Sequence, residues 1–245
     1  MLDVLTREDF DGIASLTLNR PEVRNALTPE SFRLLRRHVD DIAARTDAIG
    51  CVLLSAAGES FCAGFDMKSL KANDAAEPRS FRAETITALA NLPQPVIVIV
   101  RGHCFTGGLE LALAGDIIVA GESAIFCDSH SRLGMTAGWG LPQRLSRRIG
   151  LAAAKEMMFT SRRVSGQEAG RIGLANHVVP DDTTWQKAME LARAIVSNAR
   201  ESVLWTKRML DGGIDMPLAE ALAWEQDQKP KRGADFATRI DTQRA

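Results

Sequence analysis

The pattern of hydrophobic and polar positions changes type several times along the first half of the chain. Residues 2–18 alternate polar and apolar positions around Asp11-Gly12, which predicts a β-hairpin with a tight turn at that pair. Continuous apolar runs at Cys51–Leu54 and Val96–Val100 predict two buried strands. The segment between the hairpin and the first of these runs has its apolar residues at helical spacing, at Phe32, Leu35, Val39 and Ile42.

The second half of the chain adds short strands and then becomes helical throughout. Apolar runs predict two more strands at 117–120 and 124–126, and His177–Pro180 predicts a last one. Helices are expected at 80–91, 141–149 and 151–158, with a capping box at Ser165–Glu168 starting another. Strands and helices therefore alternate up to about residue 180, and helices alone follow. This order predicts an α/β core over residues 1–180 and a helical C-terminal region over residues 181–245.

A glycine turn links the strand at Val96–Val100 to a short apolar helix. Gly107 and Gly108 open this helix, which leaves backbone N–H groups without acceptors inside it. Glu110 lies in the first turn among apolar neighbours, so its carboxylate needs a partner, a cavity or a raised pKa. A capping box does not explain Glu110, because the residue three positions earlier is Gly107. An active-site carboxylate and a buried structural ion pair both remain open.

The composition excludes some classes of function. The chain has 245 residues, of which 45% are hydrophobic and 25% charged, which suits one large α/β protein. The net charge of −1 gives no indication of a nucleic-acid or membrane partner. The N-terminus has acids where a signal peptide is basic, and no apolar run reaches transmembrane length. The four cysteines lack C-x-x-C spacing and no cluster has metal-ligand spacing, which favours a cytoplasmic protein without a metal.

A second glycine-bearing turn, Phe61–Met67, follows the strand at Cys51–Leu54. Together with Gly102–Ala112 it closely resembles the crotonase superfamily, the enoyl-CoA hydratases and isomerases. Further stretches match other motifs of that family: Asn19-Arg20-Pro21, Asn25-Ala26-Leu27, Gly134-x-x-x-Gly138 and Gln143-Arg144-Leu145. The resemblance covers nearly the whole chain.

This resemblance implies a core of ββα turns in a right-handed spiral and a C-terminal helical region that builds trimers or hexamers. It implies an acyl-CoA thioester as substrate, no further cofactor, and a place in fatty acid metabolism. By position, the backbone N–H groups of Ala63 and Gly107 would form an oxyanion hole for the enolate-like thioester oxygen. Substrate contacts are implied at Arg24, Ala26, Gly64, Asp66, Met67, Gly108, Met135 and Trp139. Asp66 also suits the N-cap of the helix that follows it.

The chain departs from the family at one catalytic position. Family hydratases use two glutamates, and Glu110 matches the first, but His130 occupies the position of the second. His130 could replace the lost glutamate, because histidine exchanges protons near neutral pH. Glu110 could instead act alone, with His130 or Asp128 binding substrate, or the protein could bind acyl-CoA without turnover. The leading hypothesis is hydration of a 2-enoyl-CoA to a 3-hydroxyacyl-CoA, with isomerisation and hydrolysis as rivals.

Overall fold

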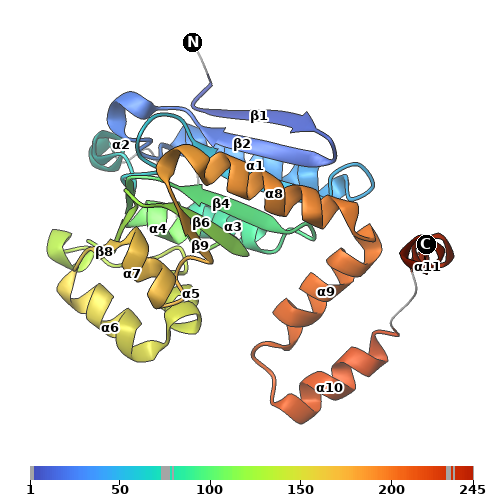
Figure 1. Ribbon diagram of the computed structural model, residues 1–245. Helices are drawn as coiled ribbons and strands as arrows, with labels where there is room; N and C mark the ends of the chain where they lie inside the picture. The colour runs from blue at the N-terminus through green and yellow to red at the C-terminus, as the bar shows by residue number, and fades with distance from the viewer. Residues whose placement is uncertain (1–2, 73–77, 79, 230–232, 234, 245) are drawn as a thin grey trace.

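The computed structural model describes residues 3–72, 78, 80–229, 233 and 235–244. Its main sheet has six strands in the order β1-β2-β3-β4-β6-β9 (Figure 1). The strands are β1 (Leu5–Phe10), β2 (Ile13–Leu18), β3 (Cys51–Ala56), β4 (Val96–Val100), β6 (Ile117–Gly121) and β9 (His177–Val179). β1 runs antiparallel to β2, and all other neighbours in this sheet are parallel. The strands predicted from the apolar runs are confirmed.

The first two strands form the predicted hairpin. Asp11 and Gly12 both have positive φ, 49° and 76°, and Phe10 pairs directly with Ile13. Two successive residues with positive φ give the turn whose twist matches that of the flanking strands. Aspartate and glycine tolerate this backbone better than other residues, which explains the pair at this position.

The two faces of the main sheet are covered by different helices. On one face, Leu53, Ile97 and Val119 pack against α8 (Thr184–Ser197). On the other face, Leu54, Val98 and Ile118 pack with α1 (Pro29–Ala44) and α3 (Ser80–Ala90). Figure 1 shows α8 in front of the sheet and α1 and α3 behind it. Because alternate residues of a strand point to opposite faces, parallel strands covered on both sides are apolar throughout, as β3 and β4 are.

A second, three-stranded sheet positions the short helix that contains Glu110. Its strands, in the order β5-β7-β8, are β5 (His103–Phe105), β7 (Ile125–Cys127) and β8 (Val164–Ser165). Helix α4 (Gly107–Ala112) follows β5 directly. The sequence did not predict β5, because a three-residue strand beginning with histidine has no distinct hydrophobic pattern. The helix starts at Gly107, at the glycine pair that was expected to open it, and ends at Ala112.

Further helices connect the strands of the two sheets. They are α2 (Met67–Ala72), α5 (Leu141–Ile149), α6 (Leu151–Thr160) and α7 (Gly166–Arg171), with 3₁₀ turns at Pro21–Val23, Ser131–Leu133 and Asp181–Thr183. α7 starts as predicted, with the Ser165 hydroxyl accepting from the Glu168 amide at 3.2 Å. The Glu168 carboxylate pairs with Arg162 at 2.7 Å. The predicted serine N-cap is therefore confirmed, but the reciprocal bond of a capping box is not observed, because the glutamate pairs with an arginine instead.

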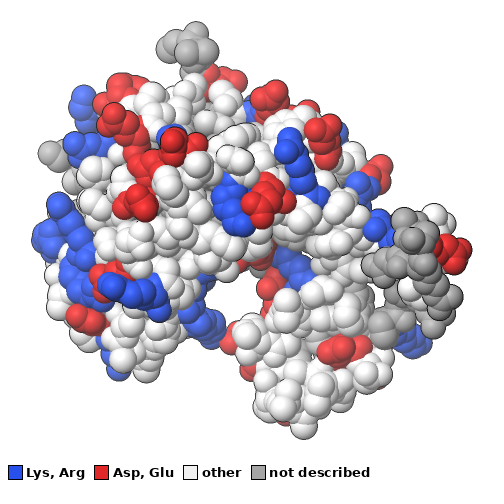
Figure 2. Space-filling model, in the orientation of Figure 1, with Lys and Arg blue, Asp and Glu red and all other residues white. Residues whose placement is uncertain are grey.

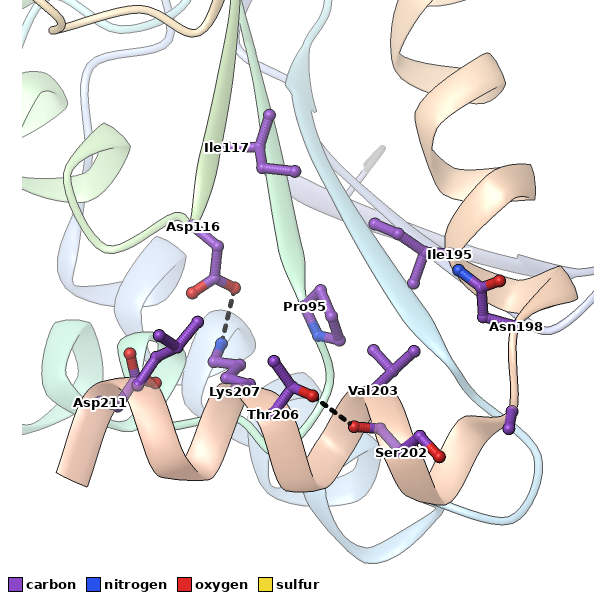
Figure 3. A pocket seen from close by; sticks show the side chains of 12 residues that line it. Pro95, Asp116, Ile117, Ile195, Asn198, Ser202, Val203, Thr206, Lys207 and Asp211 are labelled. Atoms are coloured by element: carbon purple, nitrogen blue, oxygen red, sulfur yellow. Dashed lines mark hydrogen bonds and ion pairs between the residues drawn. The ribbon is translucent and has the colours of Figure 1, made fainter. Parts of the chain in front are cut away.

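Three C-terminal helices project from the core: α9 (Arg200–Gly213), α10 (Leu218–Asp227) and α11 (Phe236–Arg244) (Figure 1). α9 is fixed to the sheet by Lys207, whose Nζ lies 2.6 Å from Asp116 Oδ2 (Figure 3). The same Nζ lies 3.2 Å from the Gln94 carbonyl oxygen. Both partners lie at the ends of β4 and β6 that face α9, so one buried cation fixes this helix to two strands.

The surface of the projecting helices carries large apolar side chains. Leu210, Ile214, Leu218 and Leu222 are exposed, and Figure 2 shows an almost uncharged surface over α9 and α10. Exposed apolar patches of this kind are common at interfaces between protein chains. The prediction of trimers or hexamers stays a prediction. None of the helices among the described residues is both long and apolar enough to span a bilayer.

Candidate active site

A cavity of about 350 Å³ lies where three segments of the chain meet. These segments are the loop after β3, the start of α4, and the loop between β7 and α5, and one side chain of α3 adds to the wall. The residues that line the cavity are Ala63, Phe65, Met67, Arg82, Thr106, Gly107, Glu110, Ser129, His130, Leu133, Met135, Thr136, Gly138 and Trp139. Both predicted acid–base residues, Glu110 and His130, are therefore in one cavity, although they are 20 positions apart in the sequence.

Glu110 is only 1% exposed, and two backbone amides hold one of its carboxylate oxygens. Its Oε1 accepts from the Trp139 amide at 2.7 Å and from the Leu141 amide at 3.3 Å. Leu141 is the first residue of α5, so the carboxylate lies at the positive N-terminal end of that helix. The second oxygen, Oε2, faces His130. No arginine or lysine pairs with Glu110 among the described residues, and the basic side chain that faces it is His130.

The pKa of Glu110 is raised above its ordinary value because the carboxyl group is buried. Three neighbours lower this pKa: the backbone amides of Trp139 and Leu141, and the nearby His130. The effect of burial is larger, so the pKa is raised overall. A carboxyl group with a raised pKa carries a proton in a larger fraction of molecules near neutral pH. Glu110 can therefore both donate and accept a proton in the same cycle.

His130 lies between two carboxyl groups. Its Nδ1 lies 2.6 Å from Asp128 Oδ1, and its Nε2 lies 3.9 Å from Glu110 Oε2. Asp128 is 1% exposed and His130 is 8% exposed, so the arrangement is shielded from bulk water. The sequence indicated His130 by its position in the family motif, and the structure places its ring toward Glu110.

The turn into α4 has a strained backbone. Thr106 has φ 47° and ψ −114°, a conformation that β-branched residues rarely adopt. Its amide donates to the Cys127 carbonyl at 2.9 Å, and its carbonyl accepts from the Glu110 amide at 3.0 Å. This turn leaves the Gly107 amide, the first of the helix, without an acceptor among the described residues. A Cβ at Gly107 would lie 2.4 Å from the Trp139 ring, so only glycine fits there.

The prediction that the Ala63 amide is an oxyanion donor is wrong. This amide donates to the Arg24 carbonyl at 2.9 Å, so its N–H group is already used within the fold. The amide two residues later is different. Leu27 pairs with this segment through Gly64 O and Asp66 N, each at 2.8 Å, which turns the Phe65 amide to the other side. Within the part of the chain that the structure describes, the Phe65 amide has no acceptor.

Several residues expected to contact substrate do not line the cavity. They are Arg24, Ala26, Gly64, Asp66 and Gly108. Asp66 caps α2 by accepting from the Lys68 and Ser69 amides at 2.9 and 3.1 Å. It also pairs with Arg20 at 3.1 Å, and the same guanidinium binds the Ala26 carbonyl at 2.6 Å. For Asp66, the structure supports the N-cap interpretation of the sequence.

The two glycines of this group are each packed closely against the neighbouring segment of the chain. A Cβ at Gly64 would lie 2.1 Å from Thr106 Oγ1, and one at Gly108 would lie 2.5 Å from the Cys62 carbonyl oxygen. They bring the loop after β3 into close contact with the start of α4. These glycines therefore allow Phe65 and Gly107, and with them their backbone amides, to line the same cavity.

The cavity wall also includes Phe65 and Arg82, two side chains that the sequence did not single out, beside the expected Trp139. Phe65 and Trp139 meet edge to face at 6.0 Å, and the Arg82 guanidinium lies 4.1 Å from the centre of the Phe65 ring. Arg82 comes from α3, whose sequence gives no motif that would indicate a site. Among the described residues, no group of three His, Cys, Asp or Glu side chains could hold a metal ion.

Comparisons with known proteins agree with this geometry. A model of the family described as enoyl-CoA hydratase/isomerase matches residues 8–235. The chain is 34% identical over 218 residues to the short-chain-enoyl-CoA hydratase of Clostridium acetobutylicum, covering 88% of this chain and 84% of that one. It is also 34% identical over 226 residues to the mitochondrial methylglutaconyl-CoA hydratase of Mus musculus, covering 89% and 72%.

A solved structure shows the same likeness in three dimensions. The enoyl-CoA hydratase of Bacillus anthracis superposes with a TM-score of 0.87 at 34% identity, covering 91% of this chain and 88% of the other. This agreement over nearly the whole chain confirms the predicted fold class, a crotonase-type α/β core with a helical C-terminal region.

Proposed function

The chain belongs to the enoyl-CoA hydratase/isomerase family, and on this basis we propose that it adds water to 2-enoyl-CoA thioesters to give 3-hydroxyacyl-CoA products. The observation that supports this most is the cavity itself. It combines a buried carboxyl group, a histidine that faces this group, and two unpaired backbone amides from separate segments. Each of these has a task in the addition of water to a conjugated thioester.

The two amides suit the thioester oxygen. When water attacks C3 of an enoyl thioester, electrons move through C2 to the carbonyl oxygen and make an enolate. We propose that the Phe65 and Gly107 amides donate to this oxygen, in place of the pair expected from the sequence. Fixed donors at the point where negative charge develops need no rearrangement during the reaction, and each contributes about 3 kcal/mol in well-studied cases.

Glu110 and His130 suit the attacking water. Glu110 Oε2 and His130 Nε2 lie 3.9 Å apart, which is too far for a direct hydrogen bond but allows both atoms to contact one water molecule. Water held there would lie beside C3 of a thioester whose oxygen occupies the amide pair. One of the two residues takes the proton of the water, and the other supplies a proton to C2.

Hydrolysis is the second candidate, because a specific observation favours it. The Asp128–His130 pair resembles the orienting acid and base that activate a nucleophile in many acyl-transfer enzymes. In hydrolysis the same water would attack the thioester carbon, and coenzyme A would leave. Isomerisation would need only one group that moves a proton from C4 to C2.

One assay separates these reactions. Purified protein is mixed with crotonyl-CoA, the loss of the conjugated thioester absorbance is followed, and the products are identified by mass. Hydration is expected to give 3-hydroxybutyryl-CoA, heavier than the substrate by one water. Release of free coenzyme A would show hydrolysis, and interconversion with the 3-enoyl isomer would show isomerisation. Tight binding without turnover of enoyl, 3-enoyl or saturated thioesters would contradict enzymatic function.

A further inference from the structure

We propose that Asp128 is a positioning residue that fixes the imidazole of His130 with its proton on Nδ1 and its lone pair on Nε2 directed at the water site. This inference rests on the proposed function, because it assigns His130 as the base and Glu110 as the acid of the same reaction. Asp128 touches neither substrate nor water in this account and acts only through His130.

Asp128 lies in the loop between β7 and the turn that contains His130, and this loop brings its carboxylate to two atoms of His130. One carboxylate oxygen, Oδ1, accepts from the backbone amide of His130 at 3.1 Å and lies 2.6 Å from Nδ1 of the same residue. The backbone contact places the carboxylate, and the side-chain contact then fixes the ring. Since an ionised carboxylate only accepts hydrogen bonds, Nδ1 must be the donor.

The orientation of the ring follows from this bond. With Nδ1 donating to Asp128, the other ring nitrogen of the neutral imidazole is an acceptor. Nε2 is the nitrogen that lies 3.9 Å from Glu110 Oε2. A ring rotated by half a turn would lose the Asp128 bond and direct carbon toward Glu110. The aspartate therefore selects both the tautomer and the ring position.

The charged groups around His130 agree with these assignments. Glu110 faces it from α4, and Asp128 faces it from the loop after β7. Arg132, two residues further on, directs its guanidinium to the Ser161 carbonyl at 2.5 Å. Arg144 of α5 directs its guanidinium to the Trp139 carbonyl at 2.7 Å. Both arginines thus bind carbonyl groups, and the two carboxyl groups are the charged partners of the ring.

The protons balance over one turnover. His130 Nε2 takes a proton from water as the oxygen bonds to C3, and the C2–C3 double-bond electrons pass to the thioester oxygen. The enolate collapses as C2 takes the proton of the Glu110 carboxylic acid. His130 is then an imidazolium beside the Glu110 carboxylate, and its Nε2 proton returns to Oε2 through the next water. The net change is one water added to one double bond.

Nitrogen NMR of the free protein tests the tautomer without any substrate. The chain contains only four histidines, His38, His103, His130 and His177, and the His130→Gln variant assigns the signals of His130. In the wild type at alkaline pH, Nδ1 of His130 is expected to carry the proton and Nε2 the lone pair. In Asp128→Asn, which removes the charge, the population is expected to shift toward the Nε2–H form.

His103 is the internal control, because its Nδ1 contacts the neutral Ser60 hydroxyl at 3.1 Å and its tautomer should not respond to Asp128→Asn. A wild-type His130 that carries its proton on Nε2 would overturn the proposal, and so would a tautomer that is unchanged in Asp128→Asn. If this variant does not fold, the wild-type spectrum alone decides. Because no substrate is present, an inactive protein with the expected tautomer would refute only the proposed function.

Kinetics provide a second measurement. Asp128→Asn is expected to lower kcat for crotonyl-CoA about 100- to 10,000-fold with little change in KM, as loss of an orienting carboxylate does elsewhere. Asp128→Glu, which keeps the charge, is expected to recover part of the rate. Equal rates in the wild type and a folded Asp128→Asn variant would contradict the positioning role. A purely structural role would instead lower thermal stability and kcat together, without recovery in Asp128→Glu.

Discussion

Glu110→Gln is expected to lower kcat for crotonyl-CoA hydration by about 1,000-fold, because the amide can neither give nor take the proton of the reaction. The substitution keeps the shape of the side chain. Its carbonyl oxygen can still accept from the Trp139 and Leu141 amides, as Glu110 Oε1 does. KM should therefore change little. Initial rates over a range of crotonyl-CoA concentrations measure both parameters.

Thermal unfolding of the same variant is the control for its fold. Burial raises the pKa of Glu110, so its contribution to stability is fully present below the ordinary glutamate pKa of about 4.3 and is lost as the pH rises through the raised value. Glutamine has no such dependence. We therefore expect the difference in Tm, that of Glu110→Gln minus that of the wild type, to increase as the pH rises from 4 to 8. A folded variant with full activity would remove Glu110 from the mechanism.

Replacing the backbone amide of Phe65 by an ester is expected to lower kcat about 100- to 1,000-fold. The exchange is made by incorporating phenyllactic acid at position 65, which removes one N–H group and leaves the side chain in place. The expected size is that measured when one oxyanion donor is lost in other enzymes. The Phe65 amide has no acceptor among the described residues, so this exchange removes no donor that the fold uses. It does make the Gly64 carbonyl, which accepts from the Leu27 amide, a weaker ester acceptor.

The matched control is the same exchange at position 63, with lactic acid. The Ala63 amide donates to the Arg24 carbonyl, so the ester there should lower the Tm while kcat stays within a few-fold of the wild type. The opposite result, a large loss of kcat at position 63 and none at position 65, would restore the pair of donors expected from the sequence.

Much of the fold followed from the hydrophobic pattern, for physical reasons that individual elements show. β4 is apolar at every position because helices cover both faces of the main sheet, and such a run is easy to detect. The Asp11-Gly12 turn was predictable because few residue pairs accept two positive φ angles. β5 was missed because its three residues are placed by pairing with β7, a contact distant in sequence.

The acid–base side chains of the candidate site could be predicted from the sequence. The direction of its backbone amides could not. Glu110 stood out as a carboxylate in an apolar helix, and His130 stood out by its position in a motif. The donor at Phe65 could not be predicted, because an amide direction depends on strand pairing and leaves no mark on residue identity. Asp128 was noticed only as a possible substrate contact, since its bond to His130 depends on the turn between them.

The most direct test of the central claim is a crystal structure of the protein with acetoacetyl-CoA bound. We expect the thioester oxygen within about 3 Å of both the Phe65 and Gly107 nitrogens, with C3 beside the gap between Glu110 and His130. A thioester oxygen bound by other groups, or an acyl chain that lies outside this cavity, would contradict the account.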